Sequence, residues 1–130
     1  MKAKKVISFA LVCITLASLL CVCVSARYIN VTAIKCDLSF SGRVATCSGN
    51  ITALSGSTID ATLTLYRKNG SNWDYVTSWT KYSAMPVLNF SNEKYTVPSA
   101  GTYKVVITAT VTRNGVAESV SNESAEKTCS

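Results

Sequence analysis

The feature of this 130-residue chain that most restricts its fold is an alternation of apolar and polar residues with a period of two. Every second residue from 59 to 65 is apolar, and the same holds from 103 to 111. Successive side chains of a β-strand point to opposite faces, so this period is typical of strands with one buried face. Residues 27–130 show no helical period. The chain is therefore predicted to be all-β.

Turn signals divide the chain into about seven such strands. They are Ser41-Gly42, the Asn-Gly pair within 68–71, the corner at 98–101, and 113–115. Sequential antiparallel strands with one apolar face must cover that face with another sheet. We therefore predict a two-sheet antiparallel β-sandwich of about seven strands, similar to immunoglobulin and fibronectin type III domains.

One local segment supports this fold class. Residues 99–103, Ser-Ala-Gly-Thr-Tyr, resemble a tyrosine corner, in which a Tyr near the start of the sixth strand hydrogen-bonds back to the preceding corner. The core cysteines and tryptophan of antibody domains are not in their places, since Val105 stands where the second cysteine would be. The expected likeness to immunoglobulin domains is therefore one of architecture.

The first 26 residues have the layout of a secretory signal peptide. Lys2, Lys4 and Lys5 precede an apolar run over 6–24, and Ala26 ends the segment with a small residue. We expect cleavage after Ala26, a mature domain of residues 27–130, and secretion to the extracellular side. The alternative is an uncleaved anchor, because the run approaches the ~20 residues that a bilayer core requires. No second run of that length follows, so no membrane contact is expected after cleavage.

Charge and composition argue against several function classes. The formal charge of +6 includes three lysines of the leader, so residues 27–130 carry a charge of +3. Their basic residues are scattered, and no nucleic-acid partner is expected. The chain has no histidine, which removes the usual general base of serine hydrolases and the commonest ligand of catalytic zinc. We predict no cofactor and no metal.

Three cysteines, Cys36, Cys47 and Cys129, follow the leader. If Ser41-Gly42 formed a two-residue turn, Cys36 would stand opposite Cys47 on one face, within reach of a disulfide. An oxidising destination favours that bond, and we expect it. The pairs 36–129 and 47–129, or no intramolecular bond, are the alternatives. The free thiol of the favoured scheme, Cys129, could stay inert or link two chains into a dimer.

Aromatic residues gather after the 68–71 turn. Trp73, Tyr75 and Trp79 share one parity on the expected returning strand, 72–81. On an exposed face they could stack on sugar rings or contact a partner. The competing interpretation, which we favour because so small a domain needs large apolar side chains, places both tryptophans in the core.

Asn-x-Ser/Thr sequences occur at Asn30, Asn50, Asn69, Asn89 and Asn122. In a eukaryotic secretory pathway they could carry glycans. A chain rich in Asn, Ser and Thr also produces such triplets by chance, and we favour this explanation.

The order of several short segments resembles a known family. The segments are Ala-Thr-Cys-Ser-Gly at 45–49, Thr-Leu-Thr-Leu-Tyr-Arg-Lys at 62–68, Trp73 with Ser78-Trp79, Gly-Thr-Tyr-Lys-Val at 101–105, and Glu118-Ser119 with Ser124. Together they are similar to small secreted proteins of Gram-positive bacteria of the clostridial kind, a family described as a domain of unknown function. The resemblance implies a bacterial exported protein with an immunoglobulin-like sandwich. It implies no catalytic or binding residues.

These features predict a non-enzymatic, exported domain that binds a partner outside the cell, either a protein or a cell-wall carbohydrate, since such sandwiches work mainly through loops and edge strands. The first alternative is a surface component that associates with itself through an edge strand or Cys129. The second is a secreted hydrolase. It would depend on carboxylates such as Asp60, Asp74 and Glu93, which no sequence spacing brings together.

Overall fold

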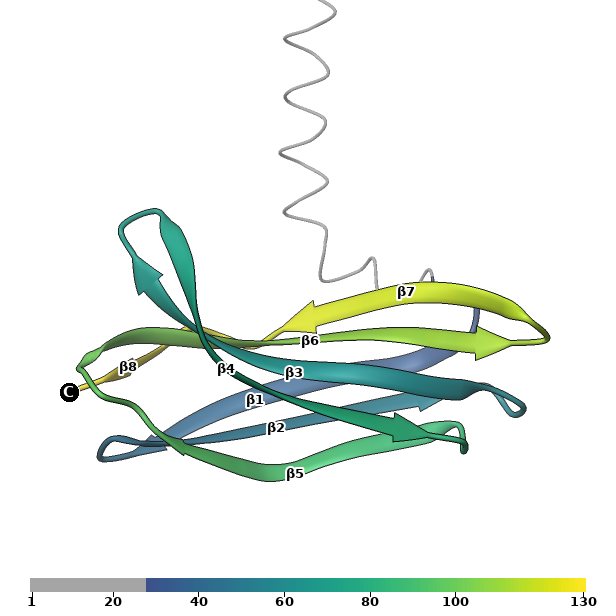
Figure 1. The fold of residues 1–130 in the computed structure, drawn as a ribbon, viewed down its shortest axis with the longest axis horizontal. Coiled ribbons are helices and arrows are strands. Elements are labelled where there is room, and N and C mark those ends of the chain that lie inside the picture. Colours follow the sequence, from purple (N-terminus) through teal and green to yellow (C-terminus); the bar gives the residue numbers. More distant parts are fainter. Residues whose placement is uncertain (1–27) are drawn as a thin grey trace, which may run out of the picture.

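The computed structural model describes residues 28–130, which form eight β-strands. The strands are β1 (Val31–Ser41), β2 (Val44–Ala53), β3 (Thr58–Asn69), β4 (Asn72–Ser83), β5 (Val87–Thr96), β6 (Gly101–Arg113), β7 (Val116–Glu123) and β8 (Lys127–Cys129). They make two antiparallel sheets, β1-β2-β5 and β4-β3-β6-β7 with β8 beside β6 (Figure 1). The predicted all-β sandwich is confirmed. The predicted leader, 1–26, lies outside the described residues, and among those described no helix has the length and apolarity to cross a membrane.

The two sheets bury one hydrophobic core, and the alternation predicted its inward faces correctly. The buried residues include Ile34 and Leu38 on β1, Ala45, Cys47, Ile51 and Ala53 on β2, Ile59, Ala61, Leu63 and Leu65 on β3, and Tyr103, Val105, Ile107, Ala109 and Val111 on β6. Strands β3 and β6 pair along ten residues at the centre of the larger sheet, with Leu63 opposite Ile107. The core is therefore centred on the inner faces of β3 and β6, and the three-stranded sheet β1-β2-β5 covers them.

Gly49 marks a place where the sheets come close together. It lies on the inner face of β2, opposite Cys36 of β1. A Cβ atom at this position would lie 2.9 Å from Cδ1 of Ile107 and 3.2 Å from Cδ1 of Leu63. A glycine inside a strand is otherwise unfavourable. The missing side chain is what lets the facing sheet approach.

Two-residue turns close three hairpins. In β1–β2 and β3–β4 the first turn residue is a glycine with positive φ, Gly42 at 59° and Gly70 at 63°, as a type II′ turn requires. In β6–β7 both Asn114 and Gly115 have positive φ, as in a type I′ turn. The predicted turn regions are confirmed. The β1–β2 turn, however, consists of Gly42 and Arg43, one residue later than expected.

The tyrosine corner predicted at 99–103 is present. The Tyr103 hydroxyl donates a hydrogen bond of 2.7 Å to the carbonyl oxygen of Ser99. The ring is fully buried, and its centroid lies 5.3 Å from that of Phe40 on β1. Tyr103 therefore ties the β5–β6 corner to the core and joins the two sheets.

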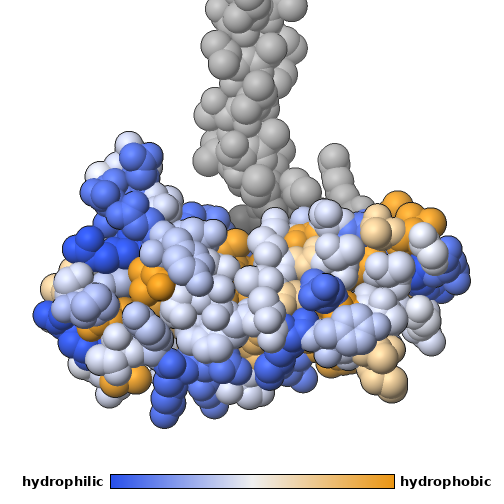
Figure 2. Space-filling model, viewed as in Figure 1, coloured by the Kyte–Doolittle hydropathy of each residue, from blue (hydrophilic) through white to orange (hydrophobic). Residues whose placement is uncertain are grey.

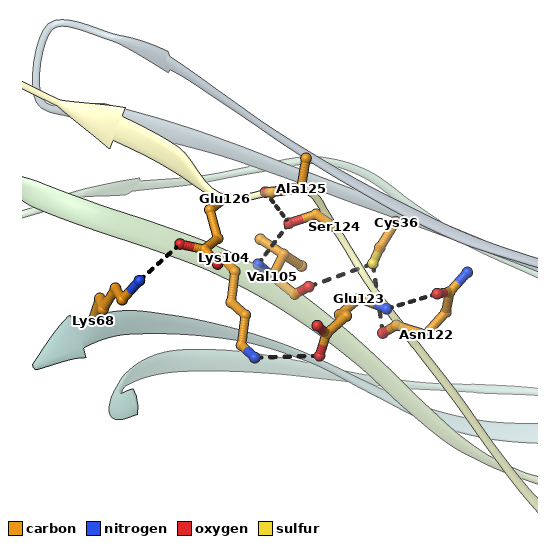
Figure 3. A network of polar contacts seen from close by, with 9 residues as sticks. All are labelled: Cys36, Lys68, Lys104, Val105, Asn122, Glu123, Ser124, Ala125 and Glu126. Carbon is orange, nitrogen blue, oxygen red and sulfur yellow. Dashed lines mark hydrogen bonds and ion pairs between the residues drawn. The ribbon is translucent and has the colours of Figure 1, made fainter. Parts of the chain in front are cut away.

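The far edge of β6 is covered by β7 and β8, which together make one interrupted strand. Strand β7 pairs with β6 from Val106 to Arg113, and β8 continues on the same side of β6, with the register shifted by one residue. Ser124 fills the break: its backbone N–H donates to Val105 O (2.8 Å), and its Oγ accepts from Val105 N–H (2.9 Å; Figure 3). The serine hydroxyl thus replaces a missing backbone partner.

Replacing Ser124 with alanine is expected to destabilise the fold by about 1–3 kcal/mol, because it leaves the N–H of Val105 buried without an acceptor. Urea unfolding followed by tryptophan fluorescence measures the change. Ser119→Ala, at an exposed position on β7, serves as the control and should change the stability by less than about 0.5 kcal/mol. Equal effects of the two substitutions would contradict the assigned role of Ser124.

The first described residues are fastened to β7. The carboxylate of Glu118 accepts hydrogen bonds from the backbone N–H groups of Ile29 (2.8 Å) and Asn30 (3.0 Å). The hydroxyl of Tyr28 accepts from the N–H of Ser121 at 3.2 Å, and the Tyr28 ring packs against the core. Tyr28, the first described residue, is thus held against β7 and the core.

Candidate functional site

The aromatic residues of β4 are split between two faces by a β-bulge. The register of β3 against β4 shifts so that Leu65 lies opposite Thr77 while the next residue, Tyr66, lies opposite Tyr75. Val76 is the extra residue in β4. An extra residue reverses which face the side chains beyond it point to. The prediction that Trp73, Tyr75 and Trp79 share one face is therefore wrong.

The two tryptophans have different environments. Trp79 lies opposite the buried Leu63 and packs against the core. Trp73 and Tyr75 lie on the outer face of the five-stranded sheet, opposite Lys68 and Tyr66. The favoured core interpretation is thus confirmed for Trp79 and wrong for Trp73.

Tyr66, Trp73 and Tyr75 form an aromatic cluster on this outer face. Tyr75 is 64 % exposed, and its hydroxyl lies 3.0 Å from the Oγ of Ser78. The Nζ of Lys104 lies 4.4 Å from the centroid of the Trp73 ring, and that of Lys68 lies 5.8 Å from it. Both distances are within the range of cation–π attraction. The lysines hold the indole in place on the sheet.

Each lysine beside Trp73 also has an acidic partner. Lys104 Nζ is 3.2 Å from Glu123 Oε2, and Lys68 Nζ is 3.3 Å from Glu126 Oε1 (Figure 3). The side chain of Lys104 is only 15 % exposed, whereas that of Glu123 is 61 % exposed. The positive charges beside the indole are therefore balanced by acidic side chains of the protein itself.

The aromatic cluster belongs to the β3–β4 hairpin, with Trp73 one residue pair from the pair that closes its turn. The β3–β4 hairpin rises away from the rest of the sandwich (Figure 1), and Figure 2 shows that its tip is mainly hydrophilic. Sequence reasoning could have found Lys68, since it faces Trp73 across a short turn. It could not have found Lys104, because this lysine reaches the cluster only through the non-local pairing of β3 with β6.

The carboxylates considered for hydrolysis lie on three different strands. Asp60 is on the outer face of β3, and Asp74 accepts a hydrogen bond of 3.0 Å from the side-chain amide of Asn69 in the β3–β4 hairpin. Glu93, on β5 of the other sheet, is 3.8 Å from Lys81. Over residues 28–130, no three Cys, Asp or Glu side chains are grouped as metal ligands. The fold does not bring these acids together.

A hollow also lies on the outer face of the three-stranded sheet, beside a bulge in β5. Its volume is about 450 Å³. Polar side chains of Lys35, Asp37, Asn50 and Asn89 line it, and the side-chain amides of Asn50 and Asn89 hydrogen-bond to each other. Its one aromatic lining residue, Phe90, is buried in the core. The hollow thus offers no exposed ring on which a ligand could stack.

The cysteine pairing expected from the sequence is wrong in its register. Because the β1–β2 turn is one residue later than predicted, Cys36 lies opposite Gly49, and Cys47 lies opposite Leu38. All three cysteines of the described residues are free. Cys129 is 2 % exposed, with its thiol 3.2 Å from the carbonyl oxygen of Gly42. Its burial argues against a dimer linked through this thiol, since β8 would first have to detach.

Burial keeps two of these thiols protonated. It raises the pKa of Cys36 to about 11, although a backbone hydrogen bond partly opposes the change. Burial, together with the nearby Cys36, raises the pKa of Cys47 to about 12. Because the thiolate is the nucleophilic form, both side chains should be unreactive near neutral pH.

We expect the native protein to resist alkylation by iodoacetamide at pH 8 at Cys36 and Cys47, and both to react after unfolding in urea. Mass spectrometry of the alkylated product gives the number and the positions of the alkylated cysteines. Rapid native labelling of either residue would contradict the burial described above.

The same shifts predict how stability changes with pH. The native thiols hold protons that an unfolded thiol, with a pKa near 8.5, has released. The stability that the raised pKa values of Cys36 and Cys47 contribute is fully present below about pH 8.5. It is lost as the pH rises toward 11 and 12. In urea unfolding at pH 8 and pH 10, a Cys36→Ala/Cys47→Ala variant should therefore lose less stability between the two pH values than the unaltered protein.

At four of the five Asn-x-Ser/Thr positions, Asn30, Asn50, Asn69 and Asn122, the residue is buried or its side-chain amide donates a hydrogen bond within the fold. Asn30 is 7 % exposed. The side-chain amide of Asn122 donates a hydrogen bond of 2.7 Å to the carbonyl oxygen of Ile34. A glycan on any of these amide nitrogens would have to displace these arrangements.

No protein-family model matches the chain, and no curated protein matches its sequence.

Proposed function

We propose that this chain is an exported, non-enzymatic binding module that recognises cell-wall carbohydrate through the aromatic cluster Tyr66, Trp73 and Tyr75. The observation that carries the proposal is the position of these rings on the outer face of a sheet, with Tyr75 largely exposed and Trp73 held by Lys104. Aromatic rings offer a flat apolar surface with a polar edge. Such a surface suits a sugar ring, which has an apolar face and a rim of hydroxyl groups.

Export is the second part of the proposal. It is supported by the basic start, apolar run and small-residue exit of residues 1–26. The resemblance to secreted proteins of clostridial-type bacteria agrees with a ligand in the bacterial cell wall. The mature product would begin at Arg27, next to the segment that Glu118 fastens to β7.

The alternatives have less support. A hydrolase would need its carboxylates near one another, and Asp60, Asp74 and Glu93 lie on three strands. Self-association through the exposed edge of β4 is opposed by the bulge at Val76, which interrupts the regular ladder that another strand would need.

The test is co-sedimentation of the secreted product with insoluble polysaccharide. The full-length chain is expressed with its leader, and the secreted protein is incubated with peptidoglycan, chitin or cellulose. We expect it to sediment with at least one of these polymers. Trp73→Ala and Tyr75→Ala should each weaken binding about tenfold, because each removes a stacking surface.

Val116→Ala is the matched control, since Val116 is also exposed (64 %) but lies at the β6–β7 turn. It should bind like the unaltered protein. Tyr75 is so exposed that its loss should leave the unfolding midpoint nearly unchanged. The proposal would be refuted if the unaltered protein sedimented with none of the three polymers, or if both aromatic variants bound as well as the unaltered protein.

A further inference from the structure

A second feature of the same outer face lies away from the aromatic cluster. It is a shallow hollow of about 430 Å³ over strands β3, β6 and β7. The side chains that line it are Asp60, Thr62, Thr108, Thr110, Ser119 and Ser121.

The pairing of the strands arranges these side chains in two rows across the sheet. Asp60 lies opposite Thr110, which lies opposite Ser119. In the next row, Thr62 lies opposite Thr108, which lies opposite Ser121. Neighbouring strands are about 4.8 Å apart. The hollow therefore presents hydroxyl groups at regular spacing, each able to donate and to accept a hydrogen bond.

An exposed aromatic residue flanks the hollow on the side of β4. Tyr82 lies directly opposite Asp60 and is 66 % exposed. Asp60 precedes Tyr66 of the aromatic cluster by six residues along β3, which is a distance of about 20 Å at the rise of a strand. The outer face thus has the aromatic cluster at one end and Tyr82 at the other. The hydroxyl side chains of the hollow lie on the strands next to Tyr82.

The charges of this face select the kind of ligand. In the described part of the chain, the lysines whose positions face this side of β3 and β6 are Lys68 and Lys104, and both are paired with glutamates. The hollow itself contains the carboxylate of Asp60. An anionic polymer would find no unpaired positive group here and would be repelled by Asp60. A neutral chain of hydroxyl-bearing sugars has the matching chemistry, since its hydroxyl groups can donate to the carboxylate.

We infer that the hollow around Asp60 is a second sugar subsite, and that a linear, uncharged polysaccharide lies along the outer face from the aromatic cluster to Tyr82. This inference rests on the proposed function, because it extends the same binding face. The aromatic cluster stacks on one end of the chain. The hydroxyl rows and Asp60 bind sugar hydroxyl groups at the other end.

The inference is tested with soluble oligosaccharides of increasing length. The secreted protein is titrated with oligomers of N-acetylglucosamine and of glucose, from two to six units, in a calorimeter. We expect affinity to rise with length. Asp60→Ala should weaken binding of the longest oligomers about tenfold and leave the shortest unchanged, whereas Trp73→Ala should weaken all lengths. Ser39→Ala, an exposed position on the other sheet, is the control.

The outcomes separate the two proposals. Length-dependent loss in Asp60→Ala supports the subsite. If Asp60→Ala binds oligosaccharides of every length as tightly as the unaltered protein does, while Trp73→Ala is still impaired, the subsite alone is overturned. No binding of any oligomer by the unaltered protein overturns both. Tighter binding of an anionic chain such as polygalacturonate than of the neutral oligomers overturns the assigned ligand class.

Discussion

Replacing Tyr103 with alanine is expected to cost most of the stability of this domain. The side chain is fully buried, and the loss of so large a ring from a core costs about 3–5 kcal/mol, with the hydroxyl bond to Ser99 lost in addition. Domains of this size are stable by only about 5–15 kcal/mol. Urea unfolding, followed by tryptophan fluorescence and circular dichroism, should therefore show a largely unfolded or very weakly folded variant.

Tyr103→Phe separates the two contributions. It keeps the ring against Phe40 and removes only the hydrogen bond, so the expected cost is about 1–2 kcal/mol. Tyr82→Phe, at an exposed position, is the control and should change stability by less than about 0.5 kcal/mol. A Tyr103→Phe variant as stable as the unaltered protein would show that the corner hydrogen bond contributes nothing.

Gly49→Val should have the second-largest effect. Its Cβ alone would come within 2.9 Å of Ile107 Cδ1, and valine adds two methyl groups in the same space. Overpacking of a core typically costs about 1–3 kcal/mol and sometimes more. We expect Gly49→Ala to lie at or below the lower end of that range, because the two atoms it would crowd are the ends of side chains that can shift, and Gly49→Val to fall within it, measured as loss of the free energy of unfolding in urea.

A compensating substitution tests the cause. Ile107→Val removes the Cδ1 atom that the new Cβ would meet, so Gly49→Ala should cost less in the Ile107→Val background than alone. Ser48→Ala, the neighbouring residue with its side chain on the other face, controls for a change in strand propensity. If the costs of Gly49→Ala and Ile107→Val simply add, close contact between the sheets is not the reason for the glycine.

The faces of the strands were predictable because burial acts on every second residue. The inward residues of β3 and β6 follow from alternation alone, and positive-φ turns near Gly70 and Asn114 follow from the local steric freedom of Gly and Asn. These signals depend on neighbours in sequence. They were sufficient to predict two covering sheets and the tyrosine corner.

Two of the errors come from places where one strand gains a residue. The cysteine pairing failed for another reason, because the β1–β2 turn lies one residue later than expected. Val76 in β4 and the break at Ser124 shift the register. The bulge in β4 sets which face Trp73 shares with its neighbours. The free-energy cost of a bulge depends on how the neighbouring strand pairs with it and how the core packs against it. The sequence of one strand does not contain that information.

The candidate site was only partly visible in the sequence for the same reason. The aromatic residues of β4 attracted attention by their type, but their grouping with Lys104, and the rows that join Asp60 to Ser119, depend on strands far apart in the chain. Serine and threonine on a solvent face are ordinary in strands. Only their assembly across β3, β6 and β7 makes a hollow.

The link between Glu118 and the first described residues has a consequence for how the molecule matures. Ile29 and Glu118 are separated by 89 positions, so the leading residues meet their partners only when the penultimate strand is available. A polypeptide delivered amino end first could pair β1 with β2 early, but the N–H groups of Ile29 and Asn30 would lack the Glu118 carboxylate until β7 had emerged. A product lacking its last strands would have no acceptor for these two N–H groups.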